Sequence, residues 1–164
     1  MLQNGGISLR LKKFHIKYYR SIESITINMP ENKPLVLFGP NNAGKTNILS
    51  AFDKALGERF PTYIEMLDSD YFFRDKNNPN IQFKCEFDEP IHINKHGECF
   101  DEICITYGCS LDENSNIIHS VSGNRLYLSQ NDRSKCHAYF IDAERNIQNA
   151  FSYSSRYSIL SRFS

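Results

Sequence analysis

Eight consecutive residues have the types and spacing of a phosphate-binding loop. They fit the pattern G-x-x-x-x-G-K-[ST] and are Gly39, Pro40, Asn41, Asn42, Ala43, Gly44, Lys45 and Thr46. In such a loop the backbone N–H groups form a concave nest for phosphate oxygens, and the following helix adds about half a positive charge at its start. We expect Lys45 to reach the β- and γ-phosphates of a nucleotide and the Thr46 hydroxyl to contact Mg²⁺. The loop therefore predicts a site for a nucleoside triphosphate and Mg²⁺.

Two elements must position this loop. Residues 34–38 are an apolar run that leads directly into Gly39, and they predict a buried strand. The residues after Thr46 predict a helix that Gly57 ends. The apolar residues with helical spacing are Ile48, Leu49, Phe52, Ala55 and Leu56. Strand, loop and helix thus follow one another in the order that phosphate binding requires.

The rest of the chain is dominated by strand patterns. Apolar residues recur at nearly every second position in 9–18 and in 25–29, and residues 60–73 are mixed and aromatic. The same alternation predicts an antiparallel meander further along, with strands at 81–88, 102–107, 116–121, 125–128 and 137–141. We therefore expect an α/β fold with a mixed sheet, one ATP-binding lobe over residues 1–150, and the start of a truncated helical element over 151–164.

Composition excludes some classes of protein. Nineteen Lys and Arg residues balance nineteen Asp and Glu residues, so net charge does not indicate a nucleic-acid partner. The longest clean apolar run, 35–38, is far shorter than the roughly 20 residues that span a bilayer. Five cysteines with no secretory signal favour reduced thiols. We expect a cytoplasmic protein with no membrane partner.

A complete ATPase also needs an acidic residue at the end of a second strand. The best match is the apolar run 138–141, which Asp142 and Glu144 follow. In one interpretation the chain is a self-contained small nucleotide-binding domain, with Asp142 as the Walker B acid and Glu144 activating water. In another, 138–141 is a core strand with a polar end. The guanine-reading pattern N-K-x-D is absent from the sequence, which disfavours a GTPase.

A third interpretation rests on a family resemblance. Residues 11–22 (LKKFHIKYYRSI) resemble the opening strand and turn of the RecF and SMC type of ABC ATPase. Residues 41–49 (NNAGKTNIL) resemble the phosphate-loop form common in that group, and residues 140–145 (FIDAER) resemble a segment of its OLD (overcoming lysogenization defect) branch. The resemblance covers residues 8–57 and 138–146.

The resemblance implies that the chain is the N-terminal, ATP-binding lobe of a longer DNA-associated ATPase used in DNA repair or phage defence. The missing C-terminal lobe and a second subunit would complete the site, so the fragment alone should not hydrolyse ATP. By the same resemblance Arg145, with Gln148 nearby, would sense the γ-phosphate, which disfavours Asp142 as Walker B. We also expect Asn47 and Arg20 to contact the nucleotide, and the basic residues near Arg20 to reach the nucleotide base or DNA phosphate.

Overall fold

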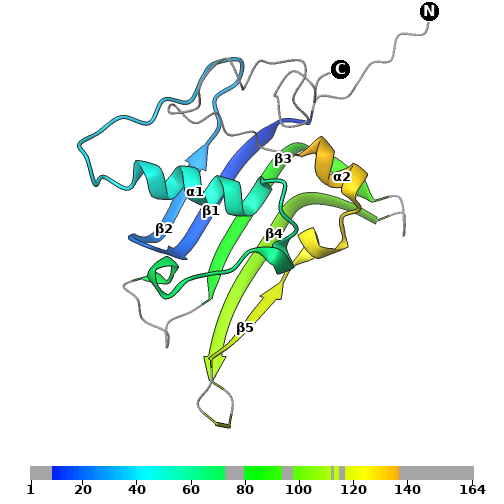
Figure 1. The fold of residues 1–164 in the computed structure, drawn as a ribbon. Helices are drawn as coiled ribbons and strands as arrows, with labels where there is room; N and C mark the ends of the chain where they lie inside the picture. Colours follow the sequence, from blue (N-terminus) through cyan, green and yellow to red (C-terminus); the bar gives the residue numbers. More distant parts are fainter. Residues whose placement is uncertain (1–8, 73–79, 94–97, 112, 115–116, 137–164) are drawn as a thin grey trace, which may run out of the picture.

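The strand patterns of the sequence produce a five-stranded antiparallel sheet in a computed structural model of the chain (Figure 1). The structure describes residues 9–72, 80–93, 98–111, 113–114 and 117–136. The strands lie in the order β2-β1-β3-β4-β5. Their bounds are β1 Leu11–Tyr19, β2 Ile22–Asn28, β3 Ile81–Ile93, β4 Glu98–Leu111 and β5 Ile117–Ser122. Consecutive strands pair with each other except at the centre, where β1 pairs with β3.

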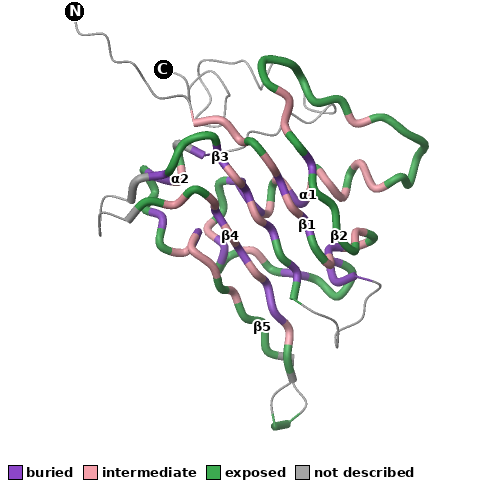
Figure 2. The backbone as a smooth tube through the Cα atoms, turned by 180° about the vertical axis from the view of Figure 1, so that it is seen from behind, coloured by how far each residue is buried: buried purple, intermediate pink, exposed green. Residues whose placement is uncertain are grey.

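The two faces of the sheet follow the period of two that a strand imposes on its side chains. Phe14 of β1 lies opposite Cys85 of β3, and both side chains are buried. Their neighbours His15 and Lys84 also lie opposite each other, on the other face. Figure 2, which shows the molecule from behind, follows the resulting alternation of buried and less buried positions along β1, β3 and β4. One face therefore forms the core and the other meets solvent.

Helix α1 (Lys45–Leu56) covers the core face and crosses the strands from the β2 side towards β4 (Figure 1). Its buried residues include Ala51 and Ala55, and the Phe52 ring stacks on Phe14 with a centroid distance of 4.0 Å. A second, shorter helix, α2 (Gln130–Lys135), lies near β3. The 3-10 turns that lie wholly within the described residues are η1 (Pro61–Tyr63), η2 (Asp68–Asp70) and η4 (Asn124–Tyr127). Neither described helix is long and apolar enough to cross a bilayer.

The structure confirms the antiparallel meander and the helix that follows Thr46 and ends before Gly57, but the predicted strand at 34–38 is wrong. Val36 and Phe38 are 68% and 91% exposed, and residues 34–38 form no strand. A strand needs a hydrogen-bonded neighbour, and within the described residues none pairs with this run, so the described sheet has no parallel part. The strand predicted at 125–128 is also wrong. Residues 124–127 form the 3-10 turn η4, which begins after Gly123.

Several predictions concern residues outside those that the structure describes. They are the strand at 137–141, the roles of Asp142, Glu144, Arg145 and Gln148, and the helical element over 151–164. The division into 1–150 and 151–164 therefore stays a prediction.

Candidate nucleotide-binding site

Residues 39–46, called the P-loop below, connect an exposed segment to the first turn of α1. Three of them have positive φ: Gly39 at 146°, Asn42 at 72° and Gly44 at 84°. Glycine reaches this region of backbone space without strain, and Asn is among the side-chain-bearing residues that tolerate it best. Gly44 is the residue that begins α1, and a β-carbon there would lie 3.7 Å from the Ser21 Oγ. Backbone conformation, more than lack of space, is thus the reason for glycine at position 44.

Polar groups of the P-loop are arranged for an anion. The Lys45 ammonium folds back over the loop and donates to the carbonyl oxygens of Gly39 and Pro40, each at 2.7 Å. Within the described part of the chain, the backbone N–H groups of Gly44, Lys45 and Thr46 donate to no acceptor. Unpaired N–H groups at the start of a helix attract phosphate. The Thr46 side chain is exposed beside them.

This donor set fits a nucleotide phosphate with Mg²⁺. Lys45 supplies a mobile positive charge, the helix start supplies N–H groups, and Thr46 supplies the hydroxyl oxygen that a hard cation prefers. No group of three or more His, Cys, Asp or Glu residues within the described ranges could hold a metal ion by itself. Thr46 would hold Mg²⁺ as one ligand among several, since Mg²⁺ usually keeps phosphate and water as its other ligands.

The turn between β1 and β2 is attached to the first two turns of α1 by side-chain hydrogen bonds. Asn47 donates through Nδ2 to the Ser21 Oγ at 2.9 Å, and its Oδ1 accepts a longer bond of 3.4 Å from Arg20. The Tyr19 hydroxyl lies 2.8 Å from the Ser50 Oγ. Arg20 has a φ of 53°, in the left-handed region that costs a residue with a side chain. The structure thus brings two of the predicted site residues, Arg20 and Asn47, together beside the P-loop.

Sequence reasoning missed Asp70, which lies on the other side of Arg20. Its carboxylate accepts a bond of 2.9 Å from the Arg20 Nε, and only 2% of the residue is exposed. Its backbone oxygen also accepts from the Arg20 N–H at 2.7 Å. Asp70 ends the short turn η2, in a segment of mixed composition with no motif, and it is fifty residues from Arg20 in sequence. Only the fold reveals the pair.

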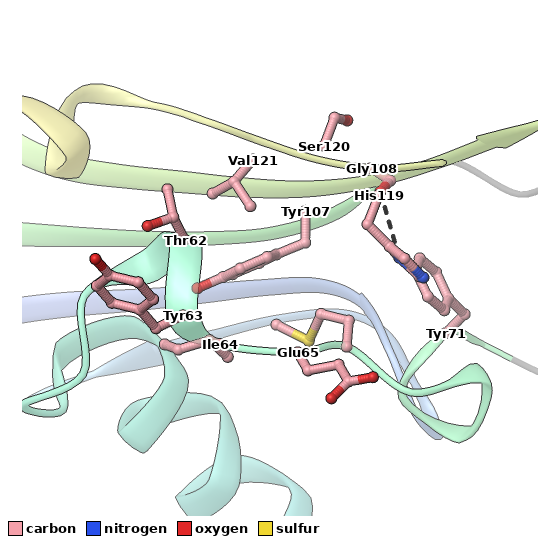
Figure 3. Close-up of a pocket in the computed structure, with 11 residues that line it drawn as sticks. Thr62, Tyr63, Ile64, Glu65, Tyr71, Tyr107, Gly108, His119, Ser120 and Val121 are labelled. Carbon is pink, nitrogen blue, oxygen red and sulfur yellow. Dashed lines mark hydrogen bonds between the residues drawn. The ribbon is translucent and has the colours of Figure 1, made fainter. Parts of the chain in front are cut away.

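A cavity lies elsewhere, between residues 62–66 and the paired strands β4 and β5 (Figure 3). Its volume is about 260 Å³, and Tyr107 lies across it. The Tyr71 hydroxyl is 3.4 Å from the His119 Nδ1 at one side. The Tyr107 hydroxyl is buried and has no hydrogen-bond partner within the described residues. Burial raises the pKa of both tyrosines to about 12.

Comparison with known proteins gives three results. A family model described as an AAA ATPase domain matches residues 10–163. An OLD nuclease from Thermus scotoductus is 29% identical over 149 residues, which are 84% of this chain but only 27% of the nuclease. A solved structure from work on ATP-driven dimerization and DNA stimulated activation of SMC ATPases aligns with a TM-score of 0.42 and 17% identity, over 77% of this chain and 76% of the other.

The family match and the OLD nuclease relative confirm the resemblance inferred from the sequence. They also confirm the fold class, an α/β fold of the P-loop NTPase type. The chain spans 27% of the length of its curated relative.

Proposed function

Because the chain belongs to the AAA ATPase domain family, we propose that it is the ATP-binding N-terminal lobe of a DNA-associated ATPase of the RecF, SMC and OLD type. The observation that carries the proposal is the P-loop itself. Its unpaired N–H groups, its lysine and its threonine hydroxyl converge at the start of α1. This combination suits a phosphate chain with Mg²⁺ better than it suits any other ligand class.

Each residue of the site has a distinct task in this proposal. The N–H groups of 44–46 and the start of α1 bind phosphate oxygens, with Asn41, Asn42 and Ala43 shaping the loop around them. Lys45 exchanges its two carbonyl partners for phosphate oxygens, so that its ammonium donates to negatively charged acceptors in place of neutral ones. The Thr46 hydroxyl would hold Mg²⁺, which would neutralise phosphate charge. Asn47 and Arg20 lie close enough to the P-loop to complete the contact.

The exposed run 34–38 supports a second lobe as a partner. Leu35, Val36 and Phe38 are apolar and directly precede the P-loop, yet they are 40%, 68% and 91% exposed. A contiguous exposed apolar run usually marks an interaction surface. The curated OLD nuclease is far longer than the region that matches this chain. We infer that a further lobe of the same ATPase covers 34–38 and adds a strand beside it.

The proposal limits what the chain does by itself. It binds ATP weakly, because other contacts come from the second lobe and from an opposing subunit of a homodimer. It does not hydrolyse ATP appreciably, and Arg145 acts on the γ-phosphate only in the complete protein. The DNA partner, a role in DNA repair or phage defence, and a cytoplasmic location belong to the complete protein as well.

Calorimetric titration of the purified chain with ATP and Mg²⁺ tests the proposal. We expect Lys45→Ala to weaken binding by about tenfold or more, because a charge-assisted phosphate contact is lost. Lys33→Ala is the matched control, since Lys33 is exposed in the segment before the P-loop and outside it. Equal affinity of Lys45→Ala and the parent would contradict the phosphate-loop assignment. ATP turnover that Asp142→Asn abolishes would instead favour a self-contained domain.

A further inference from the structure

We propose that Asp70 is a positioning residue, which holds the Arg20 guanidinium beside the P-loop for contact with nucleotide phosphate. The inference rests on the proposed nucleotide-binding function and adds a residue that no sequence motif marks. Figure 1 shows η2, which Asp70 ends, beside the turn between β1 and β2. Three elements far apart in sequence therefore meet at Arg20: the β1–β2 turn, α1 and η2.

The Asp70 carboxylate is held rigidly. One oxygen accepts from the Arg20 Nε at 2.9 Å, and the other accepts from the Leu67 backbone N–H at 3.1 Å. The Lys54 ammonium lies 3.6 Å from that second oxygen. The side chain of Asp70 is 2% exposed, whereas that of Arg20 is 33% exposed. The carboxylate is thus a buried anchor, and the guanidinium extends from it towards solvent.

Arg20 keeps donors available in this arrangement. Its Nε is used by Asp70 and its Nη1 by Asn47, at 2.9 and 3.4 Å. Its Nη2 has no hydrogen-bond partner within the described residues. A guanidinium has five N–H donors in a planar fork that suits phosphate oxygens. The bonds from Nε and Nη1, together with the Tyr19 ring centroid 5.1 Å from the guanidinium carbon, restrict the plane of the fork. The remaining edge is presented beside the first turn of α1.

The side-chain bond is not needed to hold the two segments together. The Arg20 N–H already donates to the Asp70 carbonyl oxygen at 2.7 Å, and Tyr19 forms a β-bridge with Tyr71. These backbone contacts attach η2 to the turn whatever the side chain at position 70. What the carboxylate adds is the orientation of a long, flexible side chain. Ordering that side chain before the ligand arrives lowers the cost of binding.

A double-mutant cycle on ATP affinity tests the proposal. We expect Arg20→Gln to weaken ATP binding by about tenfold and Asp70→Asn by about fivefold. If Asp70 acts through Arg20, the double variant binds no more weakly than Arg20→Gln alone. Lys54→Met is the matched control, because it removes a neighbour of the carboxylate but no contact with Arg20. It should bind ATP within about twofold of the parent.

The outcomes separate this inference from the proposed function. No ATP binding by the parent, or full binding by Lys45→Ala, overturns the proposed function. If Lys45→Ala loses ATP binding while Asp70→Asn binds ATP as tightly as the parent, the proposed function stands and only the role of Asp70 is overturned. Additive losses in the double variant also overturn it, since a stability defect would be independent of Arg20.

Circular dichroism shows whether Asp70→Asn folds. If it does not, nitrogen NMR of the arginine side chains in the parent tests whether Arg20 stays bonded to Asp70 when nucleotide binds. We expect the Arg20 Nε–H signal to stay in its hydrogen-bonded position when ATP and Mg²⁺ are added, while the Nη signals move. Movement of the Nε–H signal to the position of a solvent-exposed arginine would show that nucleotide removes Arg20 from Asp70, and would overturn the proposal.

Discussion

Arg125 donates a hydrogen bond from its Nη2 to the carbonyl oxygen of Gly57, at 2.6 Å. The same guanidinium donates to the Lys54 carbonyl oxygen at 2.7 Å. Both acceptors belong to the last turn of α1 and the residue that ends it, where carbonyl groups lack partners within the helix. Arg125 is 2% exposed, and burial lowers its pKa. The helix that begins at the P-loop is therefore held at its far end by a buried cation from η4, the 3-10 turn that follows β5.

Replacing Arg125 with methionine should destabilise the fold by about 3 kcal/mol, because buried carbonyl oxygens lose a charged donor. The measurement is urea-induced unfolding followed by circular dichroism. Arg133→Met is the control, since Arg133 lies over the Phe60 ring at 4.7 Å. It should cost about 1 kcal/mol or less. Equal losses for the two variants would contradict the role given to Arg125.

Two buried tyrosines should respond in opposite ways to loss of the hydroxyl. Tyr107→Phe removes a hydroxyl with no partner among the described residues, so we expect no loss of stability or a gain of about 1 kcal/mol. Tyr19→Phe removes the 2.8 Å bond to Ser50 and should cost about 1 kcal/mol. Chemical denaturation of the two variants and the parent provides the comparison. A loss in Tyr107→Phe as large as that in Tyr19→Phe would show that Tyr107 has a partner.

Alkaline pH should destabilise the chain through three buried tyrosines. Burial raises the pKa of Tyr19, Tyr71 and Tyr107 to about 12, against an ordinary value of 10.0. Between these values the unfolded chain has released the phenolic proton and the folded chain has not, so rising pH favours unfolding. The stabilisation is complete below pH 10 and is lost as pH rises towards 12. Phenolate absorbance measured during titration should show three late-ionising groups; ordinary ionisation of every tyrosine in the folded chain would refute this.

The exposed run before the P-loop should promote self-association of the isolated chain. Val36→Lys and Phe38→Lys should reduce association in sedimentation experiments, because each puts a charge into an apolar surface. Stability should change by no more than about 0.5 kcal/mol, since both side chains are largely exposed. Tyr127→Lys is the control, because Tyr127 is 70% exposed but lies outside the run. If it reduces association as much, the run has no special role.

The elements that the sequence predicts well are those whose signal is local. The P-loop, its helix and the alternating strands each follow from the spacing of nearby residues. The run 34–38 has the composition of a buried strand, but its burial depends on a neighbour that is not among the described strands. No local pattern indicates the role of Arg125 either. An arginine among apolar residues indicates the end of a strand, and it gives no sign that its side chain caps a distant helix. Asp70 could not be predicted for the same reason, because its partner Arg20 is distant in sequence and only the fold brings the two together.

The central pairing of β1 with β3 has a consequence for folding. Phe14 and Cys85 lie opposite each other although the P-loop and α1 separate them in sequence, whereas β1–β2, β3–β4 and β4–β5 join consecutive strands. Consecutive hairpins form with little loss of chain entropy, but closing β1 on β3 requires ordering the long segment between them. The packing surface for α1 exists only after that closure. Nucleotide would then bind only after the rate-limiting step, so ATP should slow unfolding and leave the refolding rate nearly unchanged.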